Sequence, residues 1–104
     1  AAALARDYLL AHLAEDPGLD DVAAASGLSP FHMLRVFRAR FGLPPHAWLT
    51  QERLRRARSL LAGPLRLADI AQDTGFADQA HLTRRFKRQY GLTPGRYRKI
   101  VQNT

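Results

Sequence analysis

Residues 67–94 read LADIAQDTGFADQAHLTRRFKRQYGLTP, and this stretch decides how the chain is expected to fold. Its apolar residues recur at three- and four-residue spacing before and after Gly75, which is typical of two helices separated by a turn. Asp78 stands where a helix N-cap is expected, and Gly91 stands where that helix should end. The stretch therefore predicts a short helix, a glycine-containing turn and a longer helix over about 79–90.

The same pattern occurs earlier in the chain, where residues 19–45 read LDDVAAASGLSPFHMLRVFRARFGLPP. The two copies align at an offset of 48 residues up to the turn, and at an offset of 49 after one inserted residue. Ser29 takes the place of Asp78 as N-cap, and Pro30 suits the first helical position. Because a glycine lets the chain turn sharply between two helices, the copies predict two helix-turn-helix units, the first with its longer helix over about 30–41.

The segments outside the copies also show helical periodicity, and no alternating run predicts a strand, so we expect an all-α fold. Pro44 and Pro45 open a helix that should run to about Leu61 or Ala62. The expected parts are a first helix-turn-helix subdomain over 1–43, a linker helix over 44–62 and a second subdomain over 63–104. At about 1.5 Å per residue the linker is roughly 25 Å long, so we expect it to set the two longer helices about one DNA turn apart.

Charge is distributed unevenly along the chain. The net charge is +7, but residues 1–27 contain one cation and five anions, whereas residues 28–104 contain fifteen cations and four anions. A basic surface of this size favours a polyanionic partner, because each neutralised phosphate releases counterions. Charge alone leaves DNA, RNA and anionic lipid open as partners.

Several function classes find no support in the sequence. There is no cysteine, which excludes disulfides and thiolate metal sites, and the four histidines show no ligand spacing. No grouping of Ser, His and Asp, no pair of carboxylates and no glycine-rich phosphate loop stands out. No apolar run is long enough for a membrane span. We therefore expect no metal, no cofactor, no membrane partner and no enzymatic activity.

Three stretches of the second copy carry a family resemblance: DIAQDTGF at 69–76, QAHLTRRFK at 79–87 and GLTPGRYR at 91–98. With GLSP at 27–30 and RVFR at 35–38 in the first copy, they make the chain resemble the DNA-binding domain of the arabinose-regulator (AraC/XylS) family of bacterial transcription factors. The resemblance extends from about Leu4 to Tyr97.

This resemblance implies seven helices in two homeodomain-like lobes, with the third and sixth helices entering adjacent major grooves of one duplex. It also implies a bacterial cytoplasmic, nucleoid-associated protein and a separate effector-binding or dimerisation domain that these residues do not include. The expected function is sequence-specific binding of double-stranded DNA that regulates transcription, by recruiting or blocking RNA polymerase.

The residues expected to contact bases lie on the first two turns of each recognition helix, opposite its apolar stripe. They are Phe31, Leu34, Arg35, Gln79, Ala80, Thr83 and Arg84. Arg35 and Arg84 occupy equivalent positions, and a guanidinium can bond guanine O6 and N7 together. Gln79 suits adenine, Thr83 offers a hydroxyl or a methyl, and the apolar side chains can contact a thymine methyl.

A second set of residues is expected to contact the phosphate backbone. Its members are Ser29, Arg38, Arg53, Asp78, Arg85, Lys87 and Arg88. The two N-cap residues are included because a capped helix N-terminus presents backbone amides to a phosphate. Such contacts set affinity and register rather than sequence preference.

Three alternatives remain open at this stage. Packing of Phe31 against the first helix is an alternative, because exposed aromatic side chains are uncommon without a partner. The chain could also be a basic helical protein-interaction module that uses Phe31, Leu34 and Trp48 to anchor an acidic partner such as an RNA polymerase subunit. Arg40, Arg55, Arg56 and Arg58 are also compatible with ordinary solvated charge.

Overall fold

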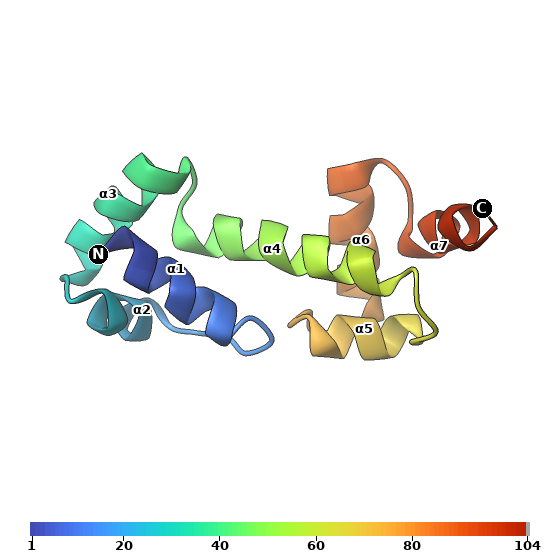
Figure 1. The fold of residues 1–104 in the computed structure, drawn as a ribbon, viewed down its shortest axis with the longest axis horizontal. Coiled ribbons are helices and arrows are strands. Elements are labelled where there is room, and N and C mark those ends of the chain that lie inside the picture. The colour runs from blue at the N-terminus through green and yellow to red at the C-terminus, as the bar shows by residue number, and fades with distance from the viewer. Residues whose placement is uncertain (104) are drawn as a thin grey trace. The chain divides into compact units, whose positions relative to one another are not determined.

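The computed structural model describes residues 1–103, and its regular elements there are seven helices with no strand (Figure 1). The helices are α1 (Ala2–Ala11), α2 (Leu19–Ser26), α3 (Pro30–Phe41), α4 (Pro45–Leu60), α5 (Leu67–Asp73), α6 (Gln79–Tyr90) and α7 (Pro94–Gln102). The all-α, seven-helix expectation is therefore confirmed, and α3 and α6 have the bounds that the sequence predicted. In this described part, every helix is too short or too polar to cross a membrane.

The chain forms two compact units, unit 1 (Ala1–Glu52) and unit 2 (Arg53–Thr104), and the division falls inside α4. The three-part division expected from the sequence stays a prediction. Unit 1 has a core from α1, α2, α3 and the first half of α4, made of Ala5, Leu9, Leu13, Val22, Ala23, Met33, Phe37 and Leu49. Unit 2 has a core from the rest of α4 with α5 and α6, made of Leu54, Ala57, Leu61, Ile70, Ala71, Phe76, Leu82 and Phe86.

An aromatic cluster fixes α3 against α4 in unit 1. The ring of Phe37 is fully buried, and its centroid lies 4.7 Å from that of Phe41. Trp48 meets the same ring edge-on at 5.7 Å. Such edge-to-face and tilted pairs add to the stabilisation from burial. The orientation of α3 on its unit is thus set by its own inner face.

Unit 2 repeats this packing with the equivalent residues. Phe86 is fully buried, with Tyr90 at 4.6 Å and Tyr97 edge-on at 5.7 Å. Phe86, Tyr90 and Tyr97 lie 49 residues after Phe37, Phe41 and Trp48. The duplication seen in the sequence is therefore also a duplication of the core around each recognition helix.

Side-chain caps define where the two longer helices begin. The hydroxyl oxygen of Ser29 accepts a hydrogen bond from the His32 amide at 3.3 Å, and the Asp78 carboxylate accepts one from the His81 amide at 2.8 Å. Both are N-caps of the kind expected from the sequence. The turn before each helix contains a glycine with positive φ, and Gly27 has a φ of 76°. A residue with a Cβ would be strained in this conformation.

Side chains of α7 donate hydrogen bonds to backbone carbonyls that follow the last turn of α4. The Arg98 guanidinium donates hydrogen bonds to the carbonyls of Leu61, at 3.1 Å, and Gly63, at 3.4 Å. The Gln102 amide donates to the same two carbonyls, at 3.3 and 3.0 Å. These bonds occupy carbonyls that a helix C-terminus otherwise leaves without partners. They hold α7 in place on unit 2.

Candidate nucleic-acid interface

The outer face of α3 combines cationic and apolar side chains. Met33 and Phe37 point into the core, whereas Arg35 and Arg38 are exposed on the other side of the helix. Phe31, on the first turn, is 72% exposed, so the alternative that it packs against the first helix is not observed. This face therefore offers two guanidinium groups and one large, unpaired apolar surface to a partner.

Leu34 departs in part from the outward position expected for it. Its side chain is half buried and packs against the core of unit 1. Only part of it remains available for a base contact. The expected contact of Leu34 with DNA stays a prediction, now limited to the exposed edge of the side chain.

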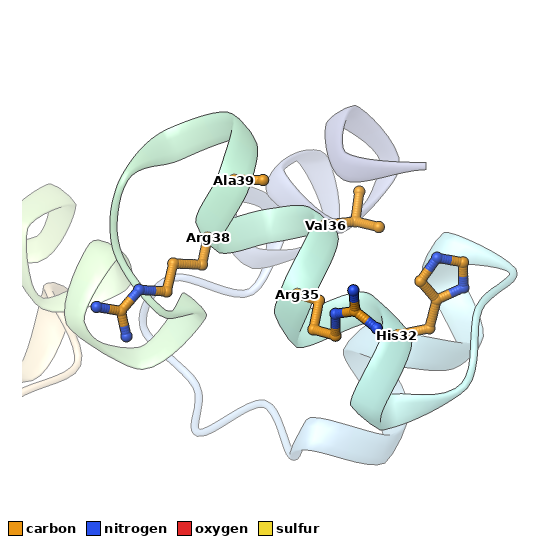
Figure 2. A pocket seen from close by; sticks show the side chains of 5 residues that line it. All are labelled: His32, Arg35, Val36, Arg38 and Ala39. Atoms are coloured by element: carbon orange, nitrogen blue, oxygen red, sulfur yellow. The ribbon is translucent and has the colours of Figure 1, made fainter.

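A shallow hollow lies along α3 beside the expected contact face, and five residues line it: His32, Arg35, Val36, Arg38 and Ala39 (Figure 2). The Arg35 and Arg38 side chains extend from the helix in different directions in this view. The rest of the lining is mainly apolar, from Val36 and Ala39. Sequence reasoning missed Val36 and Ala39 as surface residues of this face.

The outer face of α6 is more strongly basic. Leu82 and Phe86 point into the core, and the exposed residues on the opposite side are Ala80, Arg84, Lys87 and Arg88. Gln79 is exposed as the first residue of the helix, although its position is in register with Leu82 and Phe86. Thr83 and Arg85 are half buried at the edges of this face. Apart from Gln79 at the helix start, the residues predicted on α6 thus lie on one side of the helix or at its margins.

The hollow on α6 is polar, in contrast to the one on α3. Its lining consists of His81, Arg84, Arg85 and Arg88. These residues are the register equivalents, 49 positions later, of His32, Arg35, Val36 and Ala39. The i, i+3, i+4, i+7 spacing of these residues on each helix was the signal that could have identified this face.

The N-cap residues Ser29 and Asp78 are exposed, but their side-chain oxygens are engaged with their own helices. Asp78 is also negatively charged, so direct approach of its carboxylate to a phosphate is unfavourable. Any contribution to phosphate binding comes from the backbone amides that the cap orients. That contribution stays a prediction for both residues.

Arg53 does not lie where the phosphate prediction needs it. It is only 7% exposed, although a phosphate contact requires an accessible guanidinium group. It sits four residues from Leu49 and from Ala57, on the buried stripe of α4, and 48 positions after the buried Ala5. A side chain on that stripe is directed along the core rather than to solvent. We therefore remove Arg53 from the candidate phosphate contacts.

Residues 1–103 contain no cluster of histidine and acidic side chains of the kind that binds a metal ion. Within the same residues, every fully buried side-chain nitrogen and oxygen atom has a hydrogen-bond partner. The exposed faces of α3 and α6 offer guanidinium, amide, hydroxyl and apolar groups.

Comparison with known proteins places the chain among regulators. A family profile described as a helix-turn-helix domain matches residues 22–100. The chain is 34% identical over 95 residues to the regulatory protein PocR of Salmonella typhimurium, and 42% identical over 85 residues to the transcriptional activator NphR of a Rhodococcus species. These alignments cover 90% and 81% of this chain but 31% and 25% of the relatives. The chain thus spans a third or less of their length.

Solved structures give the same result. The DNA-binding domain of the global transcriptional factor AdpA, solved in complex with a target DNA, superposes with a TM-score of 0.91 at 29% identity, covering 98% of this chain and 93% of that one. A regulator from Chromobacterium violaceum with an AraC-type DNA-binding domain superposes with a TM-score of 0.88 at 26% identity, covering 96% and 90%.

Proposed function

Since the chain belongs to the AraC-type helix-turn-helix family of DNA-binding transcription regulators, we propose that it is the sequence-selective DNA-binding part of a longer regulator. In this proposal α3 and α6 each enter a major groove of one duplex. The observation that carries it is the repeated outer face: two capped helices, built on equivalent aromatic clusters, expose Arg35 and Arg84 at the same register position.

Direct reading of bases is assigned to the exposed first turns of these helices. Arg35 and Arg84 each pair with a guanine, and Gln79 pairs with an adenine. Thr83 and Ala80 lie beside Arg84 and contact neighbouring bases, the latter through its methyl group only. On α3, Phe31 and the exposed edge of Leu34 contact thymine methyl groups.

Backbone contacts are assigned to the cations at the margins of the two faces. Arg38 serves α3, and Arg85, Lys87 and Arg88 serve α6, where they lie within or beside the polar hollow. The capped helix N-termini at Ser29 and Asp78 add amide contacts. These contacts raise the affinity for every duplex, whatever its sequence.

The protein-interaction alternative loses much of its support in the structure. Trp48, one of its three expected anchors, packs against Phe37 and Phe41, and Leu34 packs against the core. RNA polymerase remains part of the proposal as a partner of the DNA-bound regulator. The proposal also includes a separate effector-binding or dimerisation domain, since the relatives are longer than this chain. It further places the protein in the bacterial cytoplasm, at the nucleoid. We propose no catalytic role.

Selection of bound duplexes from a randomised pool, followed by gel-shift titration, tests the proposed function. We expect a defined site, and we expect Arg84→Ala to relax the preference at one or two base pairs. Lys87→Ala should weaken binding to all duplexes alike and lower the salt slope by about 1. Arg56→Ala, on the exposed side of α4 and outside the assigned contacts, is the control. Equal affinity of the unaltered protein for every duplex at moderate salt would contradict the proposal.

A further inference from the structure

The two units differ strongly in charge, although they repeat the same fold. Residues 1–52 contain four Lys and Arg against six Asp and Glu, a net charge of −2. Residues 53–104 contain twelve against three, a net charge of +9. The positive charge of the whole chain therefore belongs to unit 2. A polyanion gains its long-range attraction from that unit alone.

The difference extends to the recognition faces themselves. At two equivalent positions α3 has Val36 and Ala39, whereas α6 has Arg85 and Arg88. These pairs line equivalent hollows, one mainly apolar and one polar. With Arg84, the α6 hollow therefore contains three guanidinium groups. The α3 hollow contains two, those of Arg35 and Arg38.

The large apolar side chains, in contrast, occur on the outer face of α3 and not on that of α6. Phe31 is 72% exposed on the first turn of α3, and its equivalent on α6 is Ala80. Leu34 is likewise replaced by Thr83. An exposed phenyl ring gains nothing from a phosphate, but it loses contact with water when it meets a thymine methyl group in the major groove.

On the basis of the proposed function, we propose that the two units have different roles on one duplex. Unit 2 supplies the salt-dependent, sequence-independent anchoring, through a phosphate site formed by Arg85 and Arg88 in the α6 hollow. Unit 1 supplies a nearly salt-independent increment of selectivity, through Phe31. The selectivity that Phe31 adds to the guanine contact of Arg35 then depends on apolar contact, whereas the affinity that Arg85 and Arg88 add depends on counterion release.

Exchange of equivalent residues isolates the ionic part. Arg85→Val with Arg88→Ala gives α6 the residues that α3 has at the same positions, and neither arginine belongs to the unit 2 core. Loss of two phosphate contacts lowers the salt slope by about 1.8. The affinity deficit of the double variant should therefore shrink about 12-fold between 50 and 200 mM salt, on the selected site and on a random duplex alike.

Phe31→Ala gives α3 the residue that α6 has, and it isolates the apolar part. We expect weaker binding to the selected site by the same factor at every salt concentration, with binding to a random duplex unchanged. Replacing the thymines of the selected site by uracil, which removes only the methyl groups, should weaken the unaltered protein but add nothing to the effect of Phe31→Ala. Circular dichroism and thermal unfolding of each variant confirm that it is folded.

Selective binding by the unaltered protein is measured first. If it fails, the proposed function is wrong, and this outcome is distinct from a failure of the roles assigned to the two units. Given selective binding, an unchanged salt slope in Arg85→Val/Arg88→Ala would overturn the assignment of unit 2. A Phe31→Ala variant that binds the selected site as tightly as the parent, or that weakens both duplexes equally, would overturn the assignment of unit 1. Uracil substitution without effect on the parent would do the same.

Discussion

Asp78 allows the local energetics of α6 to be tested apart from its contacts with DNA. Its carboxylate accepts the His81 amide hydrogen bond at 2.8 Å and also lies at the positive end of the helix. Loss of an N-cap side chain costs about 1 kcal/mol, and loss of the charge–dipole term costs roughly 0.3–1 kcal/mol more. We therefore expect Asp78→Ala to destabilise the protein by about 1.5 kcal/mol, which lowers the Tm by roughly 6–12 °C.

Asp78→Asn separates the two contributions. An asparagine side chain still accepts the amide hydrogen bond, so only the charge term is lost and the Tm should fall by roughly 2–4 °C. The affinity for DNA should increase, because a negative charge near the phosphates has been removed. Ser29→Ala is the matched control in unit 1, where the cap bond is longer, at 3.3 Å, and uncharged.

The measurement is thermal unfolding followed by circular dichroism, with gel-shift titration of the same samples. An Asp78→Ala protein that melts with the parent would refute the capping role. If Asp78→Asn and Asp78→Ala were equally destabilised, hydrogen-bond acceptance would not be what Asp78 contributes. If Asp78→Asn bound DNA more weakly than the parent, the carboxylate itself would contact the interface, contrary to our reasoning.

Four further predictions concern other parts of the chain. Arg84→Lys keeps the charge but loses the planar fork, so discrimination at one base pair should fall by roughly 1–3 kcal/mol in gel shifts, with an unchanged salt slope as the internal control. Phe86→Ala removes the centre of the unit 2 aromatic cluster and should cost about 3–5 kcal/mol in urea unfolding; a loss below 1 kcal/mol would contradict the burial described. Arg98→Ala removes two hydrogen bonds to the end of α4 and should cost about 1–2 kcal/mol by the same assay, more than an exposed control such as Arg56→Ala. Gly27→Ala, at a φ of 76°, should cost about 1–2 kcal/mol by calorimetry, and a neutral result would mean that the turn relaxes.

Much of the fold could be predicted because its determinants are local in the sequence. The spacing of apolar residues, the N-caps at Ser29 and Asp78 and the glycines at Gly42 and Gly91 define α3 and α6 without knowledge of any distant contact. The duplication then made each copy evidence for the other. The outward orientation of Arg35 and Arg84 followed from the same register.

The residues that could not be placed depend on contacts across the chain. Arg53 is charged, and charge normally indicates an exposed position, but its burial follows from a stripe that begins with Leu49. The bonds from Arg98 and Gln102 to α4 join residues 35 to 41 positions apart, which no local pattern indicates. The partial burial of Leu34 likewise depends on how α3 packs on its unit.

Because α4 contributes to the cores of both units, the fold could be extended by a further unit. In the register of the repeat, Pro94 and Tyr97 of α7 take the places of Pro45 and Trp48 of α4. A helix at this position completes the core of the unit before it, and α4 also contributes Leu54 and Ala57 to the core of the unit after it. The helical pattern therefore repeats along the chain with a period of three helices. A longer α7 with an apolar stripe like that of α4 would supply the first helix of a further unit, which would still need its own pair of helices.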